Sequence, residues 1–148
     1  MSPIYALSTN VITSLGFSTE ENFNNLKNEI TGVSKINDDS LFPNPFWASL
    51  VNKDTLNSYF SEKDHFTTFE KIIITSVKGS LLNTNIDVSS PKTLFVISTT
   101  KGNVELLEDK KKSIFSPERI TLWKSAEVIA NVFKNPNKPV VISNACIS

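Results

Sequence analysis

The sequence contains one cysteine and one histidine, and these two side chains are the best suited to nucleophilic or acid–base chemistry. Cys146 follows the apolar run PVVIS at residues 139–143. In open α/β sheets, ligands collect at the carboxyl ends of the strands. A cysteine just beyond a strand therefore has a position suited to catalysis. A helix beginning there would favour the thiolate, which is the nucleophilic form.

A second interpretation of this cysteine stays open, because a free cysteine is often a small buried hydrophobic residue. The other chemically suggestive side chains have plainer interpretations. His65 lies at the start of a predicted helix, and we expect a solvated or capping residue rather than a catalytic base. The basic run Lys110–Lys112 is typical of a solvated surface. Trp47 and Trp123 are expected in the core or in an interface.

The elements that would position the cysteine follow from apolar periodicity. Continuous apolar runs bounded by polar or proline residues predict three strands, at residues 3–8, 93–98 and 139–143. Apolar residues at helical spacing predict three helices, at residues 19–30, 64–83 and 117–134. Residues 35–63, which are rich in Pro, Asn, Asp and Ser, are expected to form a loop.

Capping signals support two of these helices. Ser18 and Glu21 have capping-box spacing at the start of the first helix. Ser116 and Pro117 have the N-cap and first-position pattern at the start of the last helix. All three predicted strands are apolar throughout rather than alternating. An α/β fold with a mostly parallel sheet and helices on both faces is therefore expected.

The composition limits the classes of partner. The 15 basic residues balance the 15 acidic residues, so the sequence lacks the one-signed charge of a nucleic-acid or membrane-surface protein. One cysteine cannot form an internal disulfide, and no Cys or His cluster has metal-ligand spacing. We therefore expect a cytoplasmic protein with no metal, no cofactor, and no nucleic-acid or membrane partner.

Four segments together resemble one enzyme family. PVVISNACIS resembles the active-site segment of the β-ketoacyl-[acyl carrier protein] synthases, in which a core strand leads into a turn with the nucleophilic cysteine. TSLGFSTEENFNNLKNEITGVSKI looks like the first loop and helix of that family. HFTTFEKIIITSVKGSLLNTNID is similar to its next helix, and FVISTTKGNVELL to its second strand and glycine-rich turn. The resemblance covers almost all of the 148 residues in the family's order.

The resemblance implies a fold and a reaction. Ketosynthases have the thiolase-like fold, and residues 1–148 would be an incomplete N-terminal ketosynthase domain that is truncated at the active-site cysteine. Cys146 would be the catalytic acyl acceptor in the decarboxylative condensation of acyl and malonyl thioesters of acyl carrier protein, in fatty-acid or polyketide synthesis. A homodimer, or a heterodimer with a ketosynthase-like subunit, is implied as well.

The resemblance also implies that further polar residues for decarboxylation come from a second half. The parent protein is thus expected to be an acyltransferase, and the 148-residue chain is expected to be inactive by itself. Two alternatives stay open. The chain could be a non-catalytic ketosynthase-like partner subunit, although such subunits tend to lack the cysteine. It could also be an unrelated α/β binding module with a buried cysteine.

Overall fold

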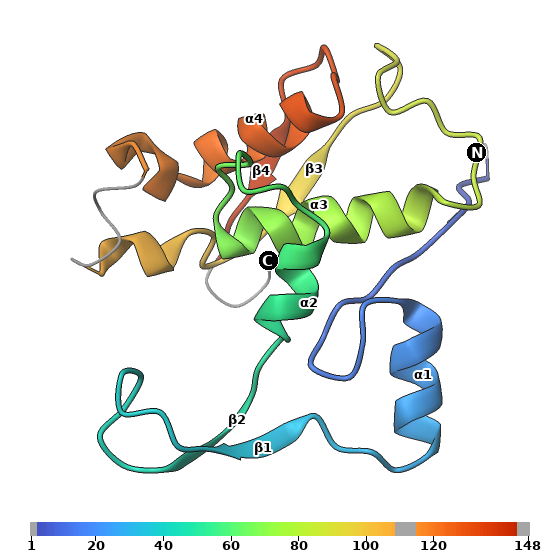
Figure 1. Ribbon diagram of the computed structural model, residues 1–148. Helices are drawn as coiled ribbons and strands as arrows, with labels where there is room; N and C mark the ends of the chain where they lie inside the picture. Colours follow the sequence, from blue (N-terminus) through green and yellow to red (C-terminus); the bar gives the residue numbers. More distant parts are fainter. Residues whose placement is uncertain (1–2, 109–114, 145–148) are drawn as a thin grey trace. The chain divides into compact units, whose positions relative to one another are not determined.

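Figure 1 shows the computed structural model, which describes residues 3–108 and 115–144. The chain divides into two units. Unit 1 consists of residues 1–61 and 75–84, and unit 2 consists of residues 62–74 and 85–148. Helix α3 (Thr68–Leu81) continues from unit 2 into unit 1. The described residues of each unit are considered separately.

Unit 1 contains the first predicted helix in a shorter form. Helix α1 (Thr19–Lys27) begins with the expected capping box, in which the amide of Glu21 donates to Ser18 Oγ at 3.1 Å. The Glu21 carboxylate in turn accepts from the amide of Ser18 at 3.1 Å. The helix ends three residues before the expected end because Asn28 is its C-cap and Glu29 has a positive φ of 58°.

The strand expected at residues 3–8 does not form, and this prediction was wrong. These residues form no regular element and have no ladder partner in the described part of the chain. Ile4 is 97% exposed and Leu7 is 73% exposed. An apolar run becomes a strand only when its backbone groups pair with a neighbour, and apolarity alone does not supply that neighbour.

The loop expected at residues 35–63 was also wrong in part. Strands β1 (Val33–Ile36) and β2 (Phe46–Ser49) form an antiparallel pair, with Ile36 opposite Phe46. Helix α2 (Lys53–Ser58) follows, and Asn52 caps it by accepting from the amide of Thr55 at 2.9 Å. The prolines that suggested a loop lie in the connection between the two strands. Their missing N–H groups remove no hydrogen bond of the strand ladder there.

Unit 2 contains the other two predicted strands. Strands β3 (Val96–Ser98) and β4 (Val140–Ile142) pair in parallel, with Val96 opposite Val140 and Ser98 opposite Ile142. The strands predicted at residues 93–98 and 139–143 are therefore confirmed in shorter form. The sheet expectation is corrected, because the described residues form one parallel pair and one antiparallel pair. The fold of the described residues is mixed α/β with small sheets.

The helices of unit 2 differ from the predicted ones at their ends. Helix α3 begins at residue 68 rather than 64 and ends at residue 81 rather than 83. The helix expected at 117–134 is two elements, a 3-10 turn η3 (Pro117–Ile120) and helix α4 (Leu122–Val132). Thr121 separates them because its ψ of 138° is extended. A second 3-10 turn, η1 (Val104–Leu107), follows β3.

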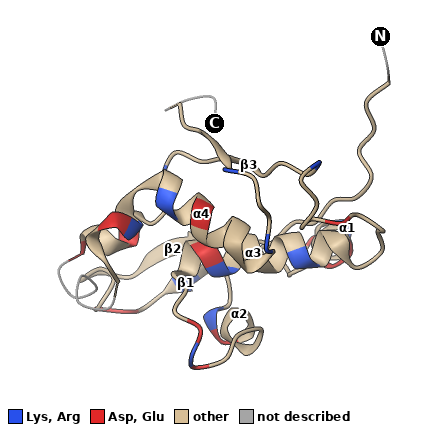
Figure 2. Cartoon of the chain, turned by 90° about the horizontal axis from the view of Figure 1, so that it is seen from above, with Lys and Arg blue, Asp and Glu red and all other residues tan. Residues whose placement is uncertain are grey.

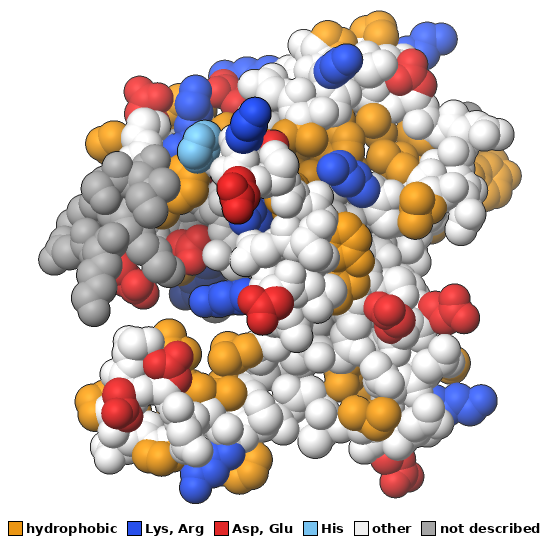
Figure 3. Space-filling model, in the orientation of Figure 1, with side chains coloured by type: hydrophobic (Ala, Val, Ile, Leu, Met, Phe, Trp, Pro, Cys, Tyr) orange, Lys and Arg blue, Asp and Glu red, His pale blue; other side chains and the backbone are white. Residues whose placement is uncertain are grey.

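The core of unit 2 is small and lies where α4 packs on the strand pair (Figure 1). The buried apolar side chains of this unit come from α3, β3, η1 and α4, namely Ile74, Ile97, Leu106, Ala126, Ile129 and Ala130. The tryptophans were expected in the core or in an interface, and they do not lie in the core, since Trp47 is 70% exposed and Trp123 is 48% exposed. An interface position for them stays a prediction. Figure 3 shows many apolar side chains at the surface, interspersed with charged ones.

Gly102 is a position at which the turn after β3 requires glycine. Its φ is +53°, and a Cβ there would lie 2.3 Å from Cδ2 of Leu122. We predict that Gly102→Ala lowers the free energy of unfolding by about 1–3 kcal/mol. Urea denaturation measures this change. Lys101→Ala, at the exposed neighbouring position, serves as the control and should change stability by less than about 0.5 kcal/mol. Equal stability of the two variants would contradict the prediction.

Candidate functional site

The candidate site is the edge at which the two parallel strands of unit 2 end. Strand β4 is followed by Ser143 and Asn144, the last described residues before the predicted nucleophile. Cys146 itself lies outside the described residues. The basic run at residues 110–112 also lies outside them. The structure thus places the segment that leads to the cysteine at a carboxyl edge, the usual location of ligands in open α/β sheets.

A tight turn borders this edge on the neighbouring strand. The turn comprises Thr99–Gly102 and directly follows β3. The amide of Thr99 donates to the carbonyl oxygen of Ile142 at 3.1 Å, which extends the strand pairing by one bond. Thr99 Oγ1 accepts from the amides of Lys101 at 3.3 Å and Gly102 at 3.1 Å. The side chain of Thr99 therefore stabilises the turn through hydrogen bonds, and the amide of Thr99 bonds the turn to the end of β4.

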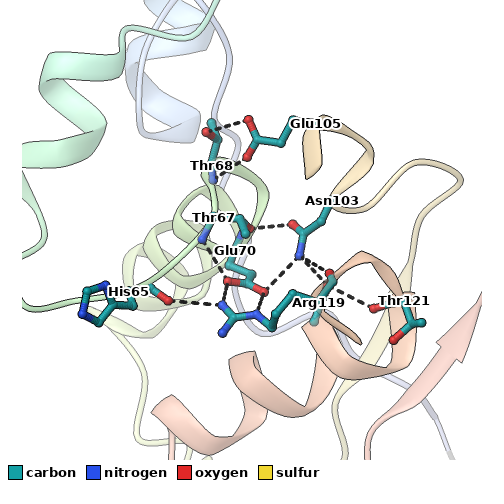
Figure 4. Close-up of polar contacts among 9 residues, drawn as sticks. His65, Thr67, Thr68, Glu70, Asn103, Glu105, Arg119 and Thr121 are labelled. Atoms are coloured by element: carbon teal, nitrogen blue, oxygen red, sulfur yellow. Dashed lines mark hydrogen bonds and ion pairs between the residues drawn. The ribbon is translucent and has the colours of Figure 1, made fainter. Parts of the chain in front are cut away.

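Behind the turn lies a buried group of polar side chains, which we call the polar cluster and which Figure 4 shows in part. Its members come from the start of α3, the end of the turn, η3 and α4, namely Thr67, Glu70, Asn103, Arg119 and Ser125. Glu70 and Asn103 are fully buried. Because buried polar groups are costly without partners, the contacts of each member decide what the cluster does.

Glu70 and Arg119 form the ion pair at the centre of the cluster. Arg119 Nε donates to Glu70 Oε1 at 3.0 Å, and Arg119 Nη2 donates to Glu70 Oε2. The second carboxylate oxygen also accepts from the amide of Thr67 at 3.0 Å. This two-pronged contact matches the planar guanidinium to the carboxylate, which is the favourable geometry for a buried pair.

Asn103 connects the ion pair to the turn. Its Nδ2 donates to Glu70 Oε1 at 3.1 Å, to Ser125 Oγ at 2.8 Å and to the carbonyl oxygen of Arg119 at 2.8 Å. Its Oδ1 accepts from Thr67 Oγ1 at 2.5 Å. The amide nitrogen and oxygen of Asn103 are thus both occupied. The cluster fixes the chain just after the turn to helices α3 and α4. Its bonded groups already have hydrogen-bond partners within the cluster.

His65 has no place in the chemistry of this edge. Its carbonyl oxygen accepts from Arg119 Nη2 at 3.2 Å, whereas its imidazole is exposed and points away from the ion pair (Figure 4). This arrangement agrees with the solvated position expected for His65 from the sequence. Thr68 is anchored separately, because its amide donates to Glu105 Oε1 at 3.0 Å.

Sequence reasoning missed the polar cluster, although one signal was present. Glu70 occupies the apolar stripe of the predicted helix, four residues after Phe66 and four before Ile74. A carboxylate on a face that is expected to be buried requires a cationic or hydrogen-bonding partner. The sequence could therefore have indicated a buried pair, but it could not identify Arg119 as the partner.

Unit 1 contains a separate cavity of about 570 Å³. Asn10, Tyr59, Thr75 and Lys78 are among its lining residues. Thr75 is 6% exposed, and its hydroxyl has no partner among the described residues. The cavity volume is in the range of small-molecule pockets, but its lining mixes one lysine, several hydroxyls and two carboxylates without a dominant chemistry.

Charges elsewhere give the site no further chemistry. Figure 2 shows that Lys and Arg positions are interspersed with Asp and Glu positions along the described chain. Hydrogen bonds from the Ser40 hydroxyl and amide hold the pKa of Asp38 below its ordinary value, and those from Ser89 do the same to the pKa of Asp87. Within residues 3–108 and 115–144, no three His, Cys, Asp or Glu side chains are grouped to hold a metal ion. No helix in these ranges could cross a membrane.

Comparison with known proteins does not assign the chain to a family. Neither a family model nor a curated protein matches it.

The ion pair gives a prediction about stability. Glu70→Gln retains the shape of the side chain but leaves Arg119 without its carboxylate in a largely buried position. We expect the free energy of unfolding to fall by about 3–5 kcal/mol. The matched control is Glu127→Gln, which breaks the Lys124–Glu127 pair at 3.3 Å, where both side chains are about one-third exposed. That change should cost less than about 1 kcal/mol.

Chemical denaturation of both variants measures the difference. If Glu70→Gln lowers the free energy of unfolding no more than Glu127→Gln does, the buried Glu70–Arg119 pair does not stabilise unit 2 as predicted.

Proposed function

We propose that the chain supplies Cys146 as the acyl acceptor for acyl transfer of the β-ketoacyl synthase type, and that it takes up the acyl group without completing the condensation by itself. In this step the Cys146 thiol loses its proton and its sulfur attacks the carbonyl carbon of a carrier thioester. A new carbon–sulfur bond forms, and the bond to the carrier sulfur breaks. The carrier leaves as a thiolate that takes up a proton, so that the enzyme holds the acyl group.

The observation that carries the proposal is the end of β4 beside the turn of β3. The segment Ser143–Asn144 leaves the parallel pair at its carboxyl edge and is followed by Ala145 and Cys146 in the sequence. The turn at Thr99–Gly102 lies against this end, because the Thr99 amide bonds to Ile142. A nucleophile after a strand and a rigid turn after its neighbour suit a site for a bound thioester.

We also propose that strand β4 pairs with a second chain, which is either another copy of this protein or a ketosynthase-like subunit. The edge of β4 that faces away from β3 pairs with no strand in the described part of the chain. Val140 is 43% exposed and Ile142 is 48% exposed, which is unusual for an apolar strand. Antiparallel pairing of this edge with a second copy, or with a ketosynthase-like subunit, would pair its backbone groups and continue the sheet beside these side chains.

The proposal is tested by direct detection of the acyl-enzyme. The full chain is incubated with an acyl-acyl carrier protein thioester and is analysed by mass spectrometry after proteolysis. Because the sequence has one cysteine, an acyl group on the peptide that contains it and that neutral hydroxylamine removes identifies a thioester at Cys146. We expect one acyl group per chain on the peptide containing Cys146, and none in Cys146→Ala.

The same experiment distinguishes the alternatives. If iodoacetamide modifies Cys146 while the carrier thioester does not, the thiol is accessible but not an acyl acceptor. That result would favour a non-catalytic partner subunit and would overturn the proposal. If neither reagent reacts until the chain is unfolded, Cys146 is a buried hydrophobic residue of a binding module.

A further inference from the structure

We propose that the cavity of unit 1 binds a neutral sugar of one or two rings. This inference goes beyond the proposed acyl transfer, because it concerns a different unit and uses neither Cys146 nor the end of the parallel strands. All residues that line the cavity belong to unit 1 and are described by the structure.

A buried hydroxyl without a partner lies in the wall of this cavity. Thr75 lines the cavity and is 6% exposed, and its Oγ1 has no hydrogen-bond partner within residues 3–108 and 115–144. An unpaired buried hydroxyl is unfavourable, because it gives up its bonds to water on folding. A bound molecule with polar groups can supply the missing bond. The hydroxyl of Thr75 therefore indicates a polar ligand.

The walls of the cavity are held together before any ligand binds. Asn10 lines the cavity, and its Nδ2 donates to the carbonyl oxygen of Phe17 at 3.1 Å and to Ser76 Oγ at 3.4 Å. Gly79 of α3 permits this close approach, because a Cβ there would lie 2.9 Å from Asn10 Cγ. The segment before α1 is thus fixed to α3, and a preformed wall lowers the entropy lost on binding.

The charged side chains of the lining favour a ligand without net charge. Lys78 and Glu20 both line the cavity, and neither makes an ion pair within the described ranges. Glu21 lines it as well, but its carboxylate already accepts from two backbone amides. A singly charged ligand would be attracted by one of Lys78 and Glu20 and repelled by the other. A hydroxyl suits both, because it donates to a carboxylate and accepts from an ammonium.

The polar groups of the lining come from separate segments of unit 1. Ser8 and Asn10 precede α1, Thr19 begins it, and Thr75 and Lys78 lie on α3. A small amino acid is also neutral overall, but it carries its ammonium and its carboxylate on one carbon atom. A sugar carries hydroxyls around its whole ring, and each of them can donate and accept. A lining whose polar groups come from several segments therefore favours the sugar.

Aromatic rings supply the apolar part of the site. Phe17 and Tyr59 both line the cavity and stack on each other with their centres 5.8 Å apart. The faces of a sugar ring consist of C–H groups, which pack on aromatic side chains while the hydroxyls bond to polar ones. The cavity of about 570 Å³ is large enough for a small molecule of this kind.

The first test compares two identical substitutions on unit 1. Thr75→Val keeps the shape of the side chain and removes the unpaired hydroxyl. The control is Thr84→Val, which removes a hydroxyl that donates to the carbonyl oxygen of Leu81 at 3.3 Å. We expect Thr75→Val to raise the urea concentration at the midpoint of unfolding and Thr84→Val not to raise it. A lower midpoint for Thr75→Val would show that its hydroxyl is already bonded and would overturn the inference.

The second test measures binding to the full chain by nuclear magnetic resonance. The probes are the methyl glycosides of glucose, galactose and mannose, and the disaccharides maltose and lactose. Phenylalanine, a zwitterion, and benzoate, an anion, serve as competing classes of ligand. We expect at least one sugar to shift the amide resonances of Thr19 and Gly79, which line the cavity on two different helices.

The variants then locate the bound sugar. We expect Thr75→Val to weaken its affinity about tenfold and Thr84→Val to leave it unchanged. Lys78→Met should also weaken binding, whereas Lys27→Met, at an exposed position of α1 outside the cavity, should not. This titration needs no acylated chain, so a failure of the proposed acyl transfer leaves its result unaffected.

Three outcomes would overturn the inference. In the first, no sugar shifts the resonances of Thr19 and Gly79. In the second, phenylalanine or benzoate shifts them more strongly than any sugar, so that the ligand is charged. In the third, a sugar binds with the same affinity to the unaltered chain and to Thr75→Val.

Discussion

The burial of the Glu70 carboxylate is the constraint on which the described structure of unit 2 depends. A carboxylate with no exposed surface is strongly disfavoured unless a cation and hydrogen-bond donors surround it. Arg119 supplies the cation, and Thr67 and Asn103 supply further donors. These partners come from segments far apart in the sequence, so satisfying one side chain fixes where several elements meet.

The polar cluster also fixes the chain at the edge of the small parallel sheet. Asn103 must lie beside Glu70 to complete the cluster, and it follows directly after the turn that leaves β3. The turn is in turn bonded to the last residue of β4 through the amide of Thr99. A polar interaction in the interior of unit 2 therefore determines the surroundings of the segment that leads to Cys146.

Local patterns predicted those elements whose stability depends on nearby residues. The capping box of Ser18 and Glu21 formed, since its partners lie three residues apart. The two apolar runs of unit 2 became strands because each has the other as a parallel neighbour. The equally apolar run at residues 3–8 did not, since pairing is a long-range property that the run does not encode. The prolines at residues 43 and 45 indicated a loop, which is correct for the connection between β1 and β2, but they did not reveal the strands on either side.

The candidate site was predictable only in part for the same reason. The order of strand, Asn144 and Cys146 indicated an edge suited to chemistry, and β4 does end just before that motif. The polar cluster was not foreseen, because Glu70, Asn103 and Arg119 are separated by 33 and 16 residues and no local pattern joins them. A charged residue that is expected to be buried indicates that a partner is needed, but only the fold determines which residue is that partner.

The central proposal is that the segment after β4, which leads to Cys146, lies beside the turn at Thr99–Gly102 at one edge of unit 2. A nitroxide spin label on the sequence's one cysteine tests this directly, through the broadening of amide resonances close to it. The account predicts strong broadening of Thr100, Lys101 and Gly102. Lys92 and Lys138, which precede the two strands, should be broadened much less. Stronger broadening at Lys92 and Lys138 than in the turn would contradict the account.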